Sequence, residues 1–275
     1  LSTVARASTL TASSTVTVSS KSELYEALSG LSSHTTVEIE NGTYAIDREL
    51  HIGPTGGEPL KDVTLKGESG DRDAVVLQGN GMENGKGANI LLKIRNAVNC
   101  TVKDMTLRDA HYHHVQVKGE QGAHSPHLQN LHLIDAGQQF VKIGRADDGV
   151  IEDSIFEFTD HAKVWENKIG GTHYYTKAID ILHQANNWRV SNNVIRRIRS
   201  PQGPEYPGGI TKAAIEVWRG CKGTVVERNL FLNCDRAIFF GNTVGNRIDH
   251  YHGIIRNNII YRDPDQPGDT GIALN

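Results

Sequence analysis

Short segments in which apolar and polar residues alternate recur along the chain, and each is followed by a turn and a second short segment. Two copies align without a gap: AIDILHQANNWRVSNNVI begins at Ala178 and AIEVWRGCKGTVVERNLF begins at Ala214. Alternation over only a few positions predicts short β-strands, and helical periodicity is nearly absent after residue 40. Repeated short strands separated by loops of variable length predict a solenoid of stacked coils.

The turns favour parallel strands over hairpins. The Asn-Gly and Asp-Gly dipeptides that mark hairpins are scarce, and a propeller would need a more regular period. Asn193, Asn229 and Asn258 recur at a turn between two strands, where asparagine tolerates left-handed backbone and can stack in a ladder. One helix is predicted at residues 20–30, with Ser20 or Ser22 as its N-cap and Gly30 as its end. We expect this helix to cover the open strand edges at the start of the solenoid.

The segment VTVSSKSELYEALSGLSSHTTVEIENGTYAI resembles the amino-terminal cap and first coil of right-handed parallel β-helix proteins of the pectate-lyase-like superfamily. In those proteins a capping helix precedes an apolar strand and a Gly-Thr-Tyr turn, here Gly42, Thr43 and Tyr44. The segments NNVIRRI, ERNLFLNCDRAIFFG and IIRNNIIYR resemble later coils. The resemblance implies an all-β fold and one domain over residues 1–275, which begins with a Ser/Thr-rich segment at 1–19. It leaves the activity open, because the superfamily includes lyases, hydrolases, epimerases and phage tailspikes.

One outward-facing row of side chains carries the candidate chemistry. Alternation places Ile179 and Ile181 inside and Asp180 outside, and the same rule gives the row Gln116, Lys142, Asp180, Glu216 and Phe239. Successive coils lie about 4.8 Å apart, and like charges on adjacent strands are destabilising. The Asp180–Glu216 pair therefore requires a bridging cation such as Ca²⁺, a retained proton or a neutralising base. Lys142 could be that base, through simple ion pairing with Asp180.

Several residues beside this row are candidates for binding substrate. Trp218 suits stacking on a sugar ring, or else covers the core beneath a loop. The predicted substrate-binding residues are Trp218, Lys118, His114 and Lys212, and His183 and Arg219 lie at the exits of two aligned strands. The histidines of DAHYHHVQV are a weak zinc signal, because alternation sends them to opposite faces.

Composition excludes some functions and suggests a location. The net charge of −3 gives no support for a general affinity for nucleic acid or an anionic membrane, and no apolar run approaches the roughly 20 residues that span a bilayer. Three cysteines form no disulfide framework and are expected to be buried thiols. The Ser/Thr-rich opening indicates either the processed terminus of a secreted or periplasmic protein, or a cloned fragment. We expect a partner or a further segment of chain to cover the C-terminal end of the solenoid.

A long groove with basic and aromatic residues suits an acidic polysaccharide. β-Elimination on a uronic acid requires a neutralised carboxylate, a base for the C5 proton and an acid for the leaving oxygen. In this interpretation Asp180 and Glu216 hold Ca²⁺, Lys142 or His183 takes the proton and Arg219 binds the substrate carboxylate. The chondroitinase B and alginate lyase family resembles this arrangement in kind. Its lysine follows the acidic rungs, whereas Lys142 precedes them, so Lys212 and Arg219 are further candidates for that role.

Two other functions are compatible with the same residues. Carboxyl groups on adjacent rungs lie near the roughly 5 Å separation of a retaining glycoside hydrolase, which would need no Ca²⁺. A non-catalytic glycan-binding or structural β-helix module is the alternative from a different class. We predict a polysaccharide lyase, with the hydrolase as the main rival.

Overall fold

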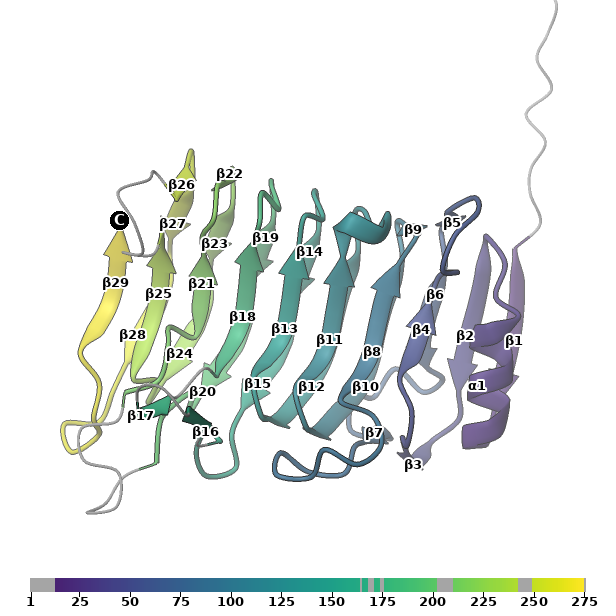
Figure 1. Cartoon of the computed structure of the whole chain (residues 1–275), viewed down its shortest axis with the longest axis horizontal. Coiled ribbons are helices and arrows are strands. Elements are labelled where there is room, and N and C mark those ends of the chain that lie inside the picture. The colour runs from purple at the N-terminus through teal and green to yellow at the C-terminus, as the bar shows by residue number, and fades with distance from the viewer. Residues whose placement is uncertain are drawn as a thin grey trace, which may run out of the picture.

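The computed structural model of the chain describes residues 13–163, 165–167, 171–173, 176–201, 210–241 and 249–274. Figure 1 shows a stack of coils with α1 (Lys21–Ser29) at one end and β29 (Thr270–Leu274) at the other. All strand pairs in the two large sheets are parallel. The predicted parallel β solenoid is therefore confirmed.

Each coil contributes one strand to an eight-stranded sheet and one or two strands to a fifteen-stranded sheet. In chain order the eight-stranded sheet contains β4 (Leu50–Ile52), β8 (Ile90–Arg95), β11 (His113–Lys118), β13 (Gln139–Gly144), β18 (Lys177–Leu182), β21 (Ile215–Val217), β25 (Arg236–Phe240) and β29. We call its outward side the groove face, because the candidate residues lie on it.

The fifteen-stranded sheet consists of two bands that share the long strands β10 and β12. The first band is β1 (Ser14–Val18), β2 (Thr35–Ile39), β6 (Thr64–Gly67), β10 (Thr101–Ala110), β12 (His127–Ala136), β14 (Val150–Glu152), β19 (Arg189–Ser191), β23 (Val225–Glu227) and β27 (Ile254–Arg256). The second adds β3 (Gly42–Ala45), β7 (Val75–Gln78), β15 (Ile155–Glu157), β20 (Val194–Arg196), β24 (Leu230–Leu232) and β28 (Ile259–Tyr261). Short pairs complete the fold: β5 (Leu60–Lys61) with β9 (Ala97–Val98), β22 (Cys221–Lys222) with β26 (His250–Tyr251), and the antiparallel β16 (Trp165–Asn167) and β17 (Gly171–His173). A 3-10 turn covers Gly119–Gln121.

The predicted helix is confirmed at nearly its expected bounds. The Ser20 side chain accepts a hydrogen bond from the backbone of Glu23, and Gly30 is the C-cap. Leu24 and Leu28 are buried in the core. The helix contacts β1, β2 and β4, the first strands of the two sheets, and its role as a cap over the strand edges stays a prediction. Strand β1 begins inside the Ser/Thr-rich segment, and residues 1–12 lie outside the described residues.

The core is a continuous column of aliphatic and aromatic side chains. All three cysteines are buried and free, as expected. No helix within the described ranges is long and apolar enough to span a bilayer.

A ladder of asparagines stacks at the bend between the two bands. The Asn193 side-chain amide donates to Asn229 Oδ1 at 3.0 Å, and that of Asn229 donates to Asn258 Oδ1 at 3.0 Å. Asn193 in turn accepts from the backbone N–H of Ser154. The ladder predicted from the sequence is confirmed, and it provides partners for buried backbone groups at each bend.

Replacing Asn229 by alanine is expected to lower the free energy of unfolding by about 2–4 kcal/mol. The backbone and side-chain N–H groups of Asn193 would lose their acceptor in a site closed to water. The matched variant Asn258→Ala should cost less, because Asn258 is only half-buried and water can replace it. Denaturant unfolding measures both. If the two variants lose the same free energy of unfolding, the burial of Asn229 does not explain how the ladder stabilises the fold.

Candidate active site

The outward row predicted from the sequence is present in the predicted register. Gln116 pairs with Lys142, Lys142 with Asp180 and Asp180 with Glu216, and Phe239 follows Glu216. In the other direction the row continues through Lys93 and His51. The geometric prediction that Asp180 and Glu216 are vertical neighbours is therefore confirmed.

Their predicted exposure is wrong. Asp180 is 2% exposed and Glu216 is 1% exposed. Lys177 lies between them, with its ammonium nitrogen 2.9 Å from Asp180 Oδ1 and 2.9 Å from Glu216 Oε2. The cation that neutralises the pair is thus Lys177. Among the described residues no ion pair joins Lys142 to Asp180.

Lys177, Asp180 and Glu216, which we call the buried triad, form a structural cluster of ion pairs rather than an open reaction centre. Burial by itself lowers the pKa of Lys177, but the charges of Asp180 and Glu216 raise it above its ordinary value, so the ammonium form is retained. The indole N–H of Trp218 donates to Asp180 Oδ1 at 2.8 Å. Each group is compensated by a partner, as buried charges require.

These two carboxylates do not fit a Ca²⁺ site. A bridging ion would occupy the position that the Lys177 ammonium already fills. Ca²⁺ also takes six to eight oxygen ligands, and no three His, Cys, Asp or Glu side chains converge as a metal site within the described parts of the chain. The two carboxyl groups do not suit hydrolysis either, because both are closed off from solvent and water cannot reach them.

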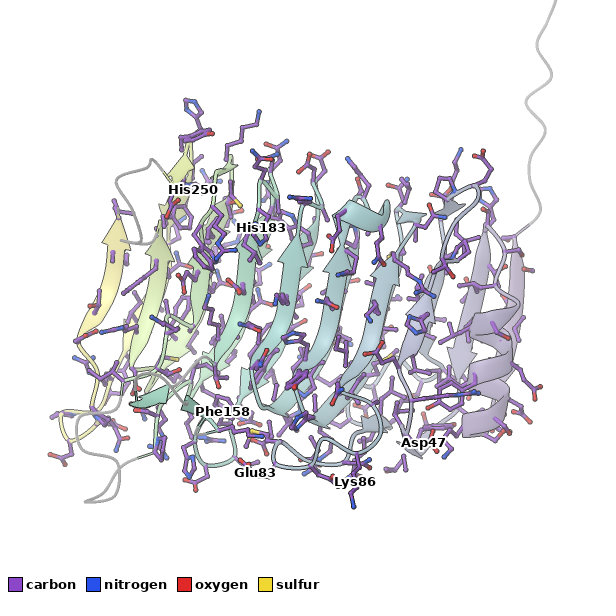
Figure 2. All side chains as sticks on the ribbon, viewed as in Figure 1. Asp47, Glu83, Lys86, Phe158, His183 and His250 are labelled. Atoms are coloured by element: carbon purple, nitrogen blue, oxygen red, sulfur yellow. The ribbon has the colours of Figure 1, made fainter. Side chains whose placement is uncertain are left out.

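A cavity of about 280 Å³ lies next to the triad, along the groove face at the exits of β11, β13 and β18. The structure brings three predicted residues together there: Lys118, Lys142 and His183. The remaining lining residues are Gln116, Val117, Glu120, Gly144, Arg145 and Leu182. In Figure 2 His183 is seen where β18 ends, on the opposite side from Glu83, Lys86 and Phe158.

Positive charge dominates this cavity. Lys118 pairs with Glu120 at 2.7 Å, whereas Lys142 and the exposed Arg145 have no carboxylate partner at ion-pair distance within the described residues. Desolvation lowers the pKa of Lys142; the charge of Asp180 opposes this shift, and those of Lys177, Lys118 and Arg219 add to it. The site therefore favours anions and eases conversion of the Lys142 ammonium to the neutral amine.

His183 is held by Arg219 from the next coil. An Arg219 guanidinium nitrogen lies 3.0 Å from His183 Nε2. Because guanidinium groups only donate, Nε2 accepts this bond and the ring proton lies on Nδ1. Desolvation, followed by the charges of Arg219 and Arg145, lowers the pKa of His183, so the ring is neutral near pH 7.

The buried triad helps to position Arg219 and His183 through Trp218. The Arg219 guanidinium lies 4.2 Å from the ring centroid of Trp218, and the Trp218 indole is fixed by its hydrogen bond to Asp180. A chain of contacts thus runs from Asp180 through Trp218 and Arg219 to His183. Arg219 already occupies one face of the indole, so that face cannot stack on a sugar.

Arg145 was missed by the sequence analysis, although the repeat contains the signal. Gly144 pairs with Leu182, so Arg145 occupies the same exit position as His183, and Arg219 has that position one coil later. All three residues have positive φ, at 56°, 59° and 58°. Left-handed backbone is uncommon for residues with bulky side chains. Extending the repeat alignment by one residue beyond the strands would have revealed this basic column.

Two predicted substrate-binding residues lie elsewhere. His114 is fully buried, with Nε2 3.0 Å from the backbone oxygen of Ile134 and its ring packed edge-on to Phe140, and desolvation lowers the pKa of His114 to about 3. Its predicted place in the groove is therefore wrong. Lys212 is exposed but does not line the cavity.

Comparison with known proteins shows the fold. No family model matches the sequence, and no curated protein matches it. Alginate lyase from Paenibacillus sp. str. FPU-7 superposes with a TM-score of 0.61 and 16% identity, over 92% of this chain and 78% of that chain. Pectate lyase Pel9A gives 0.55 and 9%, over 94% and 80%. A family 28 exopolygalacturonase from Yersinia enterocolitica gives 0.51 and 11%, over 92% and 65%. The chain is therefore a right-handed parallel β-helix protein with the pectate-lyase-like fold.

Proposed function

We propose that the protein is a polysaccharide lyase that cleaves a uronic-acid-containing polysaccharide by β-elimination at the cavity of Lys142 and His183. One observation carries the proposal: a lysine with a lowered pKa and a neutral histidine lie together in a cavity with excess positive charge. The likeness to the folds of alginate and pectate lyases adds support. The fold does not decide the reaction, since polygalacturonases share it.

The described residues supply the three requirements of the reaction. Arg145 and Lys118 neutralise the substrate carboxylate, which makes the C5 proton more acidic. Neutral Lys142 takes that proton, and the electron pair forms the C4=C5 double bond as the C4–O bond breaks. The Nδ1–H of His183 donates to the departing oxygen. No water enters the product, so the reaction is an elimination.

The test is incubation with a panel of polyuronates. A lyase generates an unsaturated uronide with a new ultraviolet absorbance, in equal number to the new reducing ends. New reducing ends without that absorbance would indicate a hydrolase and overturn the proposal. Binding without either product would indicate a glycan-binding module.

The pH dependence of kcat/KM is expected to identify the base. If neutral Lys142 takes the proton, the rate falls as pH decreases through the pKa of Lys142, which is lowered below the ordinary lysine value of 10.5. If His183 were the base, its lowered pKa would put the limb below 6.5. We expect an acidic limb that lies above the histidine value of 6.5. An acidic limb below pH 6.5 would transfer the role to His183.

A further inference from the structure

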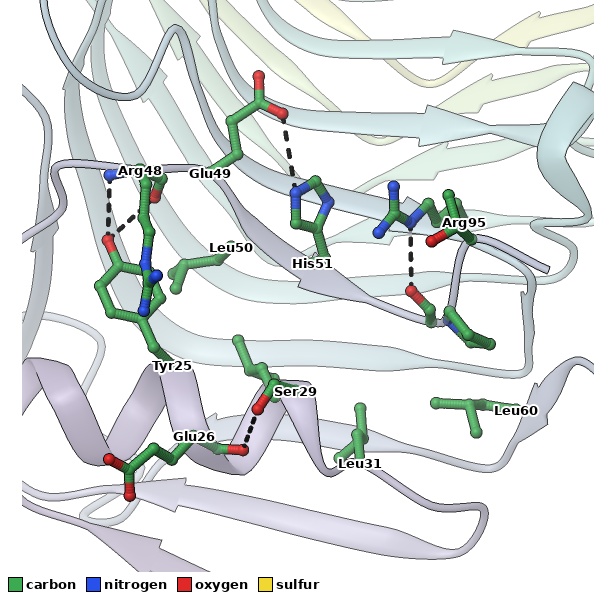
Figure 3. A pocket seen from close by; sticks show the side chains of 14 residues that line it. Tyr25, Glu26, Ser29, Leu31, Arg48, Glu49, Leu50, His51, Leu60 and Arg95 are labelled. Atoms are coloured by element: carbon green, nitrogen blue, oxygen red, sulfur yellow. Dashed lines mark hydrogen bonds and ion pairs between the residues drawn. The ribbon is translucent and has the colours of Figure 1, made fainter. Parts of the chain in front are cut away.

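We propose that a second cavity, between α1 and β4, binds the terminal sugars of the acidic polysaccharide; this inference rests on the proposed function and extends its site. The cavity has a volume of about 820 Å³, which is within the usual range for ligand sites. Figure 3 shows α1 on one side of it and β4 on the other. It is larger than the cavity of Lys142 and His183.

The outward row joins this cavity to the candidate active site. His51 pairs with Lys93, Lys93 with Gln116 and Gln116 with Lys142. Beside this row Arg95 pairs with Lys118. Three steps between rungs separate β13 from β4, a distance of about 14 Å. An extended pyranose chain advances by about one rung for each sugar, so three further sugars would connect the two cavities.

The walls combine apolar and cationic groups, as a sugar acid requires. Leu28, Leu31, Leu50 and Leu60 form the apolar part. Arg95 donates through Nε to the backbone oxygen of Gly53, which orients its guanidinium beside His51 (Figure 3). Arg48 stacks on Tyr25 at 4.0 Å from the ring centroid.

The acidic groups at the cavity leave this cationic character in place. Glu49 is neutralised by Lys93, whose nitrogen lies 2.6 Å from Oε2. Glu26 is exposed on the helix side, across the cavity from Arg95 (Figure 3). A carboxylate on a bound sugar would therefore find Arg95 and Arg48 as its nearest open cations.

His51 adds a polar group to the wall of the cavity. Its Nδ1 is buried and has no hydrogen-bond partner within the described residues, and Nε2 is 3.9 Å from Glu49. Desolvation, then the charges of Arg95 and Lys93, lowers the pKa of His51, so the ring is neutral near pH 7 and can exchange hydrogen bonds with a hydroxyl group. Because α1 stands across the path of the groove, we infer that the polysaccharide ends here.

The experiment measures the affinity of saturated oligogalacturonates and oligomannuronates of increasing length for the full chain carrying Lys142→Gln, which prevents turnover. Isothermal titration is expected to show about tenfold tighter binding once the oligomer reaches the second cavity, since it then gains charged hydrogen bonds. Adding Arg95→Gln should remove most of this gain and leave the affinity for disaccharides unchanged. Arg262→Gln, an exposed arginine outside both cavities, is the charge-matched control.

A second variant tests the cavity without changing charge. Ser29→Phe places a large side chain on the helix wall at an exposed position and should remove the same length-dependent gain. Ser22→Phe, on the same helix but outside the cavity, should have no effect. Unaltered length dependence in both Arg95→Gln and Ser29→Phe would overturn the inference. A third outcome separates the two proposals. If these variants remove the length-dependent binding but the wild-type chain forms no unsaturated product, the inference about the second cavity holds and the lyase proposal fails.

Discussion

Replacing Lys177 by methionine is expected to lower the free energy of unfolding by about 3–5 kcal/mol, the cost of leaving buried charges without their partner. Lys177 is 4% exposed and lies 2.9 Å from both Asp180 and Glu216. Without its ammonium, two carboxylates would face each other on adjacent rungs in a site closed to water. Denaturant or thermal unfolding of the purified variant measures the loss.

Two controls separate charge from packing. The triple variant Lys177→Met, Asp180→Asn and Glu216→Gln carries no buried charge and should recover most of the lost stability. Lys142→Met alters a lysine on the adjacent rung that is only half-buried, and should cost much less. If Lys177→Met and Lys142→Met are equally stable, the buried triad does not hold this part of the solenoid together.

The largest effect on activity is expected from Lys142→Gln, which should lower kcat by about 10²–10⁴-fold, as removal of a catalytic base does. The amide is close in size to the lysine stem but cannot take a proton. Stability should change little, because Lys142 has no ion-pair partner among the described residues. Steady-state rates of formation of the unsaturated product measure the effect.

The matched control for this prediction is Lys118→Gln in the same cavity. Lys118 is assigned to binding the substrate carboxylate, so its loss should mainly raise KM. A Lys142→Gln variant that keeps more than a tenth of wild-type kcat would contradict the assignment of Lys142 as the base. The pH profile would then decide whether His183 serves instead.

The roles of Asp180 and Glu216 show where inference from alternation reaches its limit. Their register followed from the aligned repeats, and it is confirmed. The burial and the ion-pair partner of the two carboxylates could not be inferred from the repeats, because the neutralising side chain comes from Lys177, at the start of β18. Alternation places Lys177 on the inner side with Ile179. In the structure Lys177 is buried, and its ammonium group reaches the outward-facing residue Asp180.

A similar departure from strict alternation explains the error in the predicted position of His114. His113, His114 and Val115 are buried one after another, as are Phe140 and Val141 on the next coil. Strict alternation requires a straight extended strand, and the burial of successive residues shows that it does not hold at the start of these strands. The position of Arg145, in contrast, was available from the repeat once the strand exits were aligned.

The sequence by itself determined the architecture and the register of this protein. Alternating apolar residues, a capped helix and recurring asparagines are local signals, and the strand pattern is repeated from coil to coil, so errors in reading it do not accumulate. Only the tertiary structure decided which outward residues are open to solvent, because that depends on side chains from neighbouring coils. Lys177 and Trp218 close over the acidic pair, while Lys142, Arg145 and His183 remain around an open cavity. Burial and charge compensation are properties of the packed coils. For this reason the candidate catalytic residues are the basic residues beside the carboxylates and not the carboxylates themselves.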